Sequence, residues 1–257
     1  MATYLQELDA ALSFARAGGR IAMRHYRKQL QSRRKADGTW VTEADWAVEA
    51  QIRLRIARAF PEYNVLGEEE GLTAAGGGPP VEGAPTWIVD PIDGTNNYMA
   101  GIPIWATLVA LAVDGEPVVG VAHAPALDET YDAATGAGAR CNGGSIAVDP
   151  AAELSDATVL FASVESWRGS AGFAELTRRA SRSRGLGDFW GHVLVARGAA
   201  HVMAEPELST WDVAALQPIV AEAGGKLTGL DGKPWKNGAC VTTNGPLHDE
   251  VLALLHG

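Results

Sequence analysis

The chain has 257 residues, 47% of them hydrophobic and 20% charged, which is long enough for one large domain or two closely packed halves with a full core. A formal net charge of −10 at pH 7 repels nucleic-acid backbone and acidic lipid, and two cysteines are too few for a disulfide scaffold or a zinc site, so these classes are excluded. No stretch approaches the roughly 18 consecutive apolar residues of a membrane span and no signal-peptide pattern opens the chain, so we expect a soluble cytoplasmic protein without nucleic-acid or membrane partners.

Two helices are predicted near the start of the chain. Apolar and small residues recur at helical spacing over residues 5–26. A second helix is expected over residues 42–60, because Thr42 and Asp45 resemble an N-cap with an acid three residues on and a proline follows the last helical position. Residues 72–85 are rich in Gly, Ala and Pro without periodicity, which predicts an irregular loop.

Strand signals dominate the middle of the chain and alternate with helix signals after it. Residues 87–90 form a short apolar run that ends in an acid. Beyond residue 150 strands and helices alternate, which predicts an α/β fold in two layered halves, residues 1–150 and 151–257, that meet at a cleft and form one catalytic unit. The other predicted elements are a hairpin over residues 105–113 and 118–124, a strand over 159–162, and helices over 172–181, around 189–196 and after Trp211.

Four acidic residues occur in contexts that point to a metal site. Asp90 ends a strand, Asp93 lies three residues on in a turn, Glu68 follows a glycine, and Asp212 lies at a helix start. Carboxylates that pack together raise one another's pKa unless a cation neutralises them, and a cluster without His or Cys favours Mg²⁺ or Mn²⁺ over zinc. Taken singly, each of these acids is better explained as an ordinary turn or cap residue.

The segment Asp93-Gly94-Thr95 adds a candidate anion site. Gly94 allows close approach of the backbone, and free amides at the start of a helix attract a phosphate group. A phosphate group could then lie between the amides of the helix start on one side and metal ions on the other. The Asp-Gly-Thr turn is common in proteins, so it becomes informative only beside the four acids.

The combination of these motifs resembles the inositol monophosphatase family. The resemblance runs over nearly the whole chain, and the motifs occur in that family's order and at its approximate separations. It implies a layered αβαβα sandwich (α+β) of the inositol monophosphatase and fructose-1,6-bisphosphatase type, a Mg²⁺-dependent phosphomonoesterase and a homodimer. The motifs are Gly67-Glu68-Glu69, Trp87-Ile88-Val89-Asp90-Pro91-Ile92-Asp93-Gly94-Thr95-Asn96-Asn97 and Trp211-Asp212-Val213-Ala214-Ala215.

The resemblance also implies a set of metal ligands. Glu68, Asp90 and the carbonyl of Ile92 would hold one Mg²⁺. Asp90, Asp93 and Asp212 would hold a second, and two or three ions are expected in each active site, with Mn²⁺ as a substitute. In such sites one metal lowers the pKa of a bound water and another stabilises the leaving oxygen.

Further roles in hydrolysis are implied for residues around these ligands. Thr95, with Asp45 or Glu68 nearby, would orient the attacking water. The amides of Gly94 and Thr95, beside Asp93, would bind the phosphoryl oxygens. The implied reaction is direct in-line hydrolysis of a small phosphate monoester, without a phosphoenzyme.

The substrate end most resembles the histidinol-phosphate phosphatase branch of the family. Asp188 stands where many sugar-alcohol phosphatases have Ser or Thr, and a carboxylate there suits a cationic substrate through a charge-assisted hydrogen bond. Glu205 aligns with a position that meets the non-phosphate end of the substrate, near Asp212. The resemblance implies that Asp188 and Glu205 bind the charged groups of L-histidinol phosphate and that Trp190 or His192 flanks its ring. A helix cap at Asp188 and core packing at Trp190 and His192 are the competing explanations.

Histidinol phosphate, and with it a step of histidine biosynthesis, is the favoured substrate on this basis. The alternatives are inositol 1-phosphate or a broad range of small-alcohol phosphates, and a non-catalytic metal-binding relative is the alternative from a different class. The latter is disfavoured because a degenerate relative would usually lack a ligand, whereas all the predicted ligands are present. Fructose 1,6-bisphosphate is a weaker candidate because no second phosphate site is evident.

Overall fold

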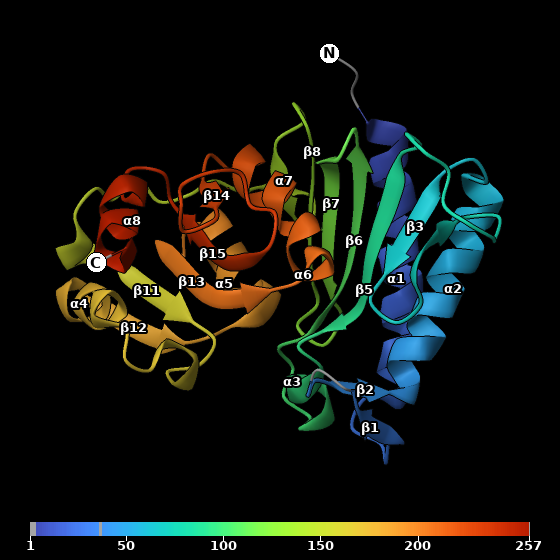
Figure 1. Cartoon of the computed structure of the whole chain (residues 1–257), viewed down its shortest axis with the longest axis horizontal. Helices are drawn as coiled ribbons and strands as arrows, with labels where there is room; N and C mark the ends of the chain where they lie inside the picture. Colours follow the sequence, from blue (N-terminus) through green and yellow to red (C-terminus); the bar gives the residue numbers. More distant parts are fainter. Residues whose placement is uncertain (1–3, 36–37, 257) are drawn as a thin grey trace.

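The structure is a computed structural model that describes residues 4–35 and 38–256. Two large β-sheets and three helical layers alternate across the molecule (Figure 1). This arrangement confirms the predicted αβαβα sandwich. The layers are α1 (Leu5–His25) with α2 (Glu43–Ala59), an eight-stranded sheet, a middle layer of α5 (Asp188–Ala196), α6 (Thr210–Ala214) and α7 (Leu216–Glu222), a five-stranded sheet, and α4 (Ala171–Arg179) with α8 (His248–His256).

A capping box explains where α2 begins. The hydroxyl of Thr42 accepts a hydrogen bond from the amide of Ala44 at 3.2 Å, and the carboxylate of Asp45 accepts one from the amide of Thr42 at 2.8 Å. Helix α1 packs its buried face against α2 and the sheet beneath it. Both predicted helices in this part of the chain are therefore confirmed.

The eight-stranded sheet has the order β10-β9-β8-β7-β6-β5-β3-β4. Strands β3 and β5 run parallel, and every other neighbouring pair is antiparallel. The predicted hairpin is confirmed as β6 and β7. The strands are β3 (Asn64–Gly67), β4 (Gly71–Ala74), β5 (Thr86–Asp93), β6 (Ala106–Val113), β7 (Glu116–Ala124), β8 (Glu129–Ala134), β9 (Ala139–Cys141) and β10 (Gly144–Ser145).

The prediction of an irregular loop over residues 72–85 is wrong at its start. Strand β4 pairs antiparallel with β3, with Gly67 opposite Gly71 and Asn64 opposite Ala74. An edge strand has a partner on one side only and needs no alternating apolar pattern, because neither of its faces must be deeply buried. The tight turn after β3, which carries Glu68, brings this segment into register.

The five-stranded sheet has the order β12-β11-β13-β15-β14. Strand β11 runs parallel to β12 and β13, whereas β15 is antiparallel to β13 and β14. All its strands follow residue 157, whereas all strands of the eight-stranded sheet precede residue 150. The division of the chain into two halves near residue 150 stays a prediction. The strands are β11 (Thr158–Phe161), β12 (Arg182–Gly185), β13 (Val202–Leu208), β14 (Lys226–Thr228) and β15 (Gly238–Thr243).

Apolar packing fixes the middle helical layer against the eight-stranded sheet. Leu108 and Ala122 of this sheet share one buried cluster with Phe189 of α5 and with Leu216 and Ile219 of α7. Full burial of a large apolar side chain contributes roughly 1.5–3 kcal/mol, so the layer is firmly held. Its packing places the starts of α5 and α6 beside the carboxyl end of β5.

Three short elements lie near that same end of β5. They are β1 (Ser32–Arg34), β2 (Trp40–Thr42) and α3 (Thr95–Met99). In Figure 1, β1, β2 and α3 lie together at one end of the eight-stranded sheet. Within residues 4–35 and 38–256, no helix is both long and apolar enough to cross a lipid bilayer.

Candidate active site

An irregularity in β5 turns two acidic side chains toward the same place. In a regular strand, residues three positions apart point to opposite faces of the sheet. Here Asp90 lies opposite Leu108 and Asp93 opposite Ala106, so β5 contains one more residue than β6 over this interval. Such a bulge reverses the alternation, and Pro91, which has no amide hydrogen, fits a position outside the regular ladder. The carboxylates of Asp90 and Asp93 can therefore bind the same metal ion.

The turn that follows β5 forms the start of α3. Gly94 has a φ of 80°, in the left-handed region that favours glycine, and a Cβ there would lie 3.0 Å from the carbonyl oxygen of Ile104. The hydroxyl of Thr95 donates a hydrogen bond to the carbonyl of Ile92 at 2.9 Å. The backbone is thus held in a tight turn that carries Asp93, Gly94 and Thr95.

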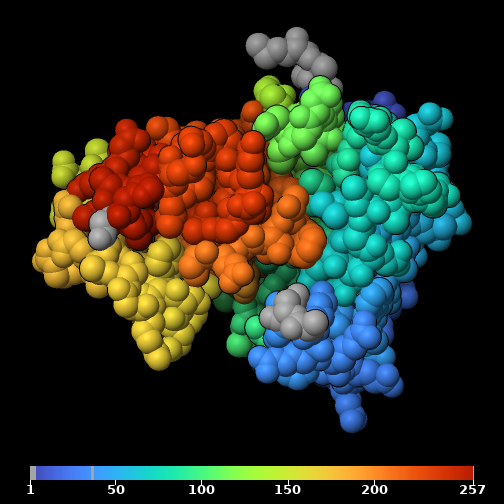
Figure 2. Space-filling model, in the orientation of Figure 1, coloured from blue at the N-terminus to red at the C-terminus, as the bar shows by residue number. Residues whose placement is uncertain are grey.

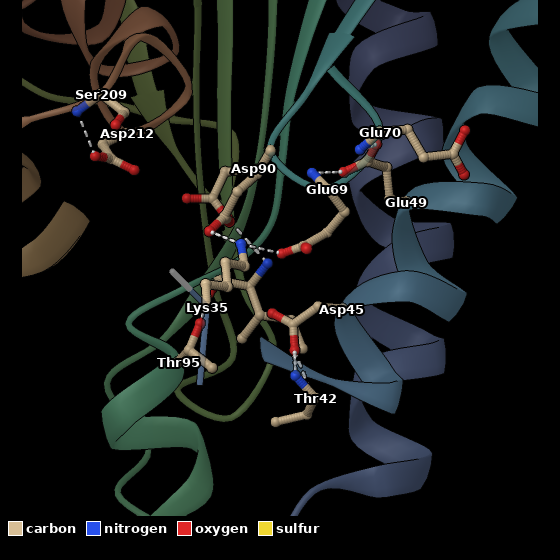
Figure 3. Close-up of polar contacts among 12 residues, drawn as sticks. Lys35, Thr42, Asp45, Glu49, Glu69, Glu70, Asp90, Thr95, Ser209 and Asp212 are labelled. Atoms are coloured by element: carbon tan, nitrogen blue, oxygen red, sulfur yellow. Dashed lines mark hydrogen bonds and ion pairs between the residues drawn. The ribbon is translucent and has the colours of Figure 1, made fainter. Parts of the chain in front are cut away.

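Asp212 reaches the same place from α6. Its carboxylate accepts a hydrogen bond from the amide of Ser209 at 2.7 Å as part of a capping box, which fixes its direction (Figure 3). Asp90, Asp93 and Asp212 each offer one carboxylate oxygen, and these oxygens lie within 4.8 Å of one another. The structure therefore brings together three of the predicted metal ligands, from both halves of the chain.

Burial and mutual repulsion raise the pKa of each of these carboxyl groups. For Asp90, burial is the largest cause, followed by the charges of Glu68 and Asp93. Burial also raises the pKa of Asp93, with the charge of Asp188 as the next largest cause, and it raises the pKa of Asp212 to about 7. A divalent cation would relieve this repulsion, and the all-oxygen donor set suits a hard ion such as Mg²⁺ or Mn²⁺.

Glu68 lies on a turn that a buried ion pair holds in place. Glu49 of α2 is fully buried, and its carboxylate accepts hydrogen bonds from the amides of Glu69 at 2.8 Å and Glu70 at 3.0 Å. The guanidinium of Arg53 pairs with Glu49 at 2.8 Å. A Cβ at Gly67 would lie 2.1 Å from a Glu49 oxygen, which explains the glycine in the Gly-Glu-Glu motif.

A lysine outside the predicted site also contacts the acids of this turn. The Nζ of Lys35 lies 2.8 Å from Glu68 and 2.6 Å from Glu69. Burial alone would lower the pKa of Lys35, but its hydrogen bonds with Glu68 and Glu69 raise it well above its ordinary value. Burial raises the pKa of Glu69 to about 7 in spite of the lysine. Both pKa values rise, which favours the charged form of Lys35 and the neutral form of Glu69, because one ammonium faces two carboxylates and cannot neutralise both.

Asp45 keeps one unpaired oxygen in the interior. One oxygen accepts hydrogen bonds from the amide and hydroxyl of Thr42, at 2.8 and 2.6 Å, whereas the other has no hydrogen-bond partner among the described residues. Burial raises the pKa of Asp45 to about 6, and the charge of Glu68 adds to the shift. In Figure 3, Asp45 and Thr95 lie on the same side of Asp90 as Lys35.

Asp188 and Glu205 form a second acidic pair at the start of α5. The carboxylate of Glu205 accepts a hydrogen bond from the amide of Asp188 at 3.2 Å, and the side-chain amide of Asn97 donates one to Asp188 at 3.0 Å. Asp188 has a φ of 55°, which places it in the left-handed region, and its own side chain does not cap α5. Burial raises the pKa of Asp188 to about 7, and the charge of Glu205 adds to it.

The two other predicted substrate contacts have different surroundings. Trp190 packs with its ring centroid 6.5 Å from that of Tyr131 and 5.9 Å from the Arg197 guanidinium carbon, and it is not among the described residues that line the cavity. His192 is only 1% exposed and lies against Glu205. These surroundings agree with core packing at Trp190, whereas His192 lies beside Glu205 and is among the residues that line the cavity.

One cavity connects the two groups of acids. It has a volume of about 360 Å³, which is suited to a small ligand. Figure 2 shows the surface hollowed between the orange segment around β13 and α6 and the blue segment around β2. Its lining includes Glu68, Asp90, Asp93 and Asp212, and also Asp188 and Glu205. The geometry therefore provides a metal and phosphate site next to an acidic recess.

Comparison with known proteins identifies the family. The chain matches the model of the Inositol monophosphatase family over residues 4–256. It belongs to this family. It is 43% identical to a histidinol-phosphatase of Streptomyces coelicolor, over 100% of this chain and 99% of the relative, and 44% identical to a histidinol-phosphatase of Mycobacterium tuberculosis, over 97% and 98%. Among solved structures, an IMPase of Thermotoga maritima superposes with a TM-score of 0.87 at 31% identity, covering 98% of this chain and 97% of that one.

These matches confirm the resemblance inferred from the motifs. The chain is a phosphatase of the phosphoric monoester hydrolase class, in a metal-dependent family, and the three-acid cluster is where a metal fits. The motifs do not include Lys35 or Glu49, which have no distinctive sequence context. Asn97 ends the Asp-Gly-Thr-Asn-Asn motif, but no role was assigned to it from the sequence.

Proposed function

We propose that this chain hydrolyses L-histidinol phosphate to L-histidinol and inorganic phosphate, with Mg²⁺ as its cofactor. The observation that carries the proposal is the buried pair of carboxylates, Asp188 and Glu205, on the wall of the cavity that also contains the metal acids. Histidinol phosphate has a primary ammonium beside its phosphate ester. One molecule could therefore place its phosphate at the metal acids and its ammonium at Asp188 and Glu205. The two histidinol-phosphatase relatives support this choice of substrate.

We assign the metal ligands as the resemblance implied. Glu68, Asp90 and the carbonyl of Ile92 would hold one Mg²⁺, and Asp90, Asp93 and Asp212 would hold another, with two or three ions in all. When bound, these ions would activate a water molecule and stabilise the charge that develops on the phosphoryl and leaving oxygens. Mn²⁺ would satisfy the same oxygen ligands.

The residues around the turn after β5 would orient the water and the phosphate. Because the Thr95 hydroxyl donates its hydrogen to the carbonyl of Ile92, its lone pairs can accept a hydrogen bond from the attacking water. Glu68 or Asp45 would take up the proton of that water. The backbone amides of Gly94 and Thr95 would bind phosphoryl oxygens. The water oxygen forms a bond to phosphorus as the ester bond breaks, and the alkoxide leaves with a proton as L-histidinol.

The acidic pair would bind the cationic end of the substrate. An ammonium in this recess gains charge-assisted hydrogen bonds with Asp188 and Glu205, and it relieves the repulsion between them. Binding of a cation also lowers the raised pKa of Asp188, so the substrate stabilises the charged form that binds it. The packing of Trp190 against Tyr131 and Arg197 leaves it outside this proposed contact.

A substrate panel tests the proposal directly. Purified protein with Mg²⁺ should release phosphate from histidinol phosphate with a much higher kcat/KM than from inositol 1-phosphate, glycerol 2-phosphate or fructose 1,6-bisphosphate. Asp188→Asn keeps the shape of the side chain and removes its charge. It should lower kcat/KM for histidinol phosphate by about ten- to a hundredfold, with a much smaller loss on glycerol 2-phosphate.

A surface variant controls for the change in net charge. Asp231→Asn removes one charge from an exposed carboxylate, which pairs only with Lys233 among the described residues. It should leave the preference for histidinol phosphate unchanged. Equal losses on the two substrates in Asp188→Asn would remove Asp188 from substrate recognition.

Inositol 1-phosphate is the second candidate substrate. An inositol-1-monophosphatase of Rhizobium meliloti is 36% identical over 91% of this chain and 87% of its own length. Carboxylates can also accept hydrogen bonds from the hydroxyls of a polyol, so Glu205 alone does not decide between the substrates. The charge of Asp188 favours the cation. Homodimer formation and a cytoplasmic location stay predictions, which sedimentation and cell fractionation would test.

A further inference from the structure

A buried histidine lies beside Glu205. The Nε2 of His192 is 3.6 Å from Oε2 of Glu205, and the two side chains are 1% and 4% exposed. On the other side of the ring, Nδ1 lies 2.7 Å from the hydroxyl oxygen of Thr242 in β15. Among the described residues, neither Nε2 of His192 nor Oε2 of Glu205 has a hydrogen-bond partner. Two buried polar atoms therefore face each other just beyond hydrogen-bond distance.

The chemistry of this line of groups favours one tautomer of His192. A carboxylate can only accept a hydrogen bond, so a ring nitrogen that faces Glu205 is favourable with a hydrogen and repulsive with a lone pair. If Nε2 carries the hydrogen, Nδ1 is an acceptor, and the Thr242 hydroxyl can donate to it. The Thr242 hydroxyl can donate or accept, so the carboxylate of Glu205 favours this tautomer and Thr242 accommodates it by donating to Nδ1.

The backbone alone does not fix the direction of the Glu205 carboxylate. Glu205 lies where the register of β13 against β15 shifts, between Glu205 and Leu208, so the ladder beyond it is irregular. Its Oε1 accepts the amide hydrogen of Asp188, and its Oε2 faces His192. Both donors belong to α5, one turn apart, so together they can set the plane of the carboxylate.

We propose that His192 is a positioning residue for substrate selectivity, whose Nε2–H orients the carboxylate of Glu205 toward the cationic end of the substrate. This inference rests on the proposed role of Asp188 and Glu205. A move of Glu205 by less than 1 Å would complete the hydrogen bond, and an ammonium in the recess would favour that move by fixing the opposite side of the carboxylate. His192 also lines the cavity, and in this proposal it acts on the substrate through Glu205.

Two amide variants separate the two contacts of the imidazole. The side-chain amide of His192→Asn can replace Nδ1 toward Thr242 but does not reach Glu205, whereas that of His192→Gln can place a donor near the position of Nε2. We expect His192→Asn to raise KM for histidinol phosphate about tenfold more than KM for glycerol 2-phosphate, with little change in the kcat ratio. His192→Gln should recover most of this selectivity.

A third variant tests the contact with Thr242. Thr242→Val keeps the shape of the side chain but removes the hydroxyl, so Nδ1 of His192 loses its hydrogen-bond partner and the ring is held less firmly toward Glu205. The selectivity should fall in the same direction as in His192→Asn, by a smaller factor. If His192→Asn and Thr242→Val lower kcat/KM equally for both substrates, the proposal is overturned, because a purely structural histidine would affect both substrates alike. Unchanged selectivity in both variants would also overturn it.

A measurement on the unmodified protein completes the test without any variant. Nitrogen NMR of the ¹⁵N-histidine-labelled protein should show His192 with a protonated Nε2, and titration with the product L-histidinol should shift that resonance. A protonated Nδ1 with a bare Nε2 would overturn the proposal. If the wild-type protein shows no preference for histidinol phosphate over glycerol 2-phosphate, the proposed function fails. If it shows that preference and the variants keep it, only the role of His192 fails.

Discussion

The metal end and the substrate end of the cavity are built in different ways. At the metal end, short-range devices direct the acids: Asp90 accepts a hydrogen bond from the amide of Ile92 two residues on, and Asp212 caps its own helix through Ser209. At the substrate end, the contacts join residues far apart in the chain. Asn97 and Asp188 are 91 positions apart, and Asp188 and Glu205 are 17 apart. Local devices can be recognised in a sequence, whereas such distant contacts appear only in the folded chain.

The start of α5 joins the two ends. Its second amide, that of Phe189, donates a hydrogen bond to Asp93 at 2.8 Å, while its first amide, that of Asp188, donates to Glu205. One helix start therefore serves a metal acid and a substrate acid through adjacent residues. Because both contacts use backbone amides, side-chain substitutions at one end can be made without removing the contact at the other.

The largest expected effect is at the metal end. Asp93→Asn keeps an oxygen for the amide of Phe189 but removes a charged ligand that acts on every substrate. We expect activity on histidinol phosphate and on glycerol 2-phosphate to fall together by roughly 10²–10³-fold or more, with the fold intact by circular dichroism. Asp188→Asn, by contrast, should affect the two substrates unequally. Wild-type phosphate release in Asp93→Asn would contradict the metal assignment and the contrast between the ends.

The same difference explains how far the sequence could predict the site. The capping box at Thr42 and Asp45 depends on neighbouring residues and was predictable, as was a strand through Asp90. The strand was expected to end at Asp90 with Asp93 in the following turn, but β5 continues to Asp93. The bulge in β5 was not, because it depends on the register with β6. The packing of Trp190 against Tyr131 and the ion pair of Glu49 with the turn of Glu68 depend on distant partners, so no local pattern indicates them.

The ion pair that holds the turn of Glu68 provides an intermediate effect. In Glu49→Gln, one of the two oxygens that accept the amides of Glu69 and Glu70 becomes an NH₂ group, and the charge that pairs with Arg53 is lost. The turn should loosen, and the Mg²⁺ concentration for half-maximal activity should rise about 10- to 100-fold for both substrates, with near-normal activity at saturating Mg²⁺.

A second buried ion pair offers a matched control for Glu49→Gln. Asp132 pairs with Arg140 and is 4% exposed, and neither residue is among those described as lining the cavity. Asp132→Asn should lower the melting temperature without changing the Mg²⁺ requirement. An unchanged Mg²⁺ requirement in Glu49→Gln would show that Glu68 is not held through this ion pair.

The smallest expected effect is on stability as a function of pH. Burial raises the pKa values of Asp45 to about 6 and of Asp212 to about 7. A carboxyl group with a raised folded-state pKa stabilises the fold below its ordinary pKa, and this stabilisation is lost as the pH rises through the raised value. The metal-free protein should therefore lose stability between about pH 4 and about pH 8, and Mg²⁺, which neutralises the acids around Asp212, should offset much of that loss.

Comparison of two melting curves isolates this contribution. Burial lowers the pKa of His123 to about 4. Its contribution to stability therefore increases as the pH rises to about 6.5, opposite to the contribution of the buried acids, and it does so with or without metal. The difference between melting temperatures with Mg²⁺ and with a chelator removes the contribution of His123. This difference should widen steadily from about pH 5 to about pH 8 in the wild type and should be much smaller in Asp93→Asn, because one ligand is missing. In Asp231→Asn it should widen as in the wild type, since that carboxylate is exposed and pairs with Lys233. A difference that stays constant with pH in the wild type would show that the buried acids of the metal end do not hold the cation.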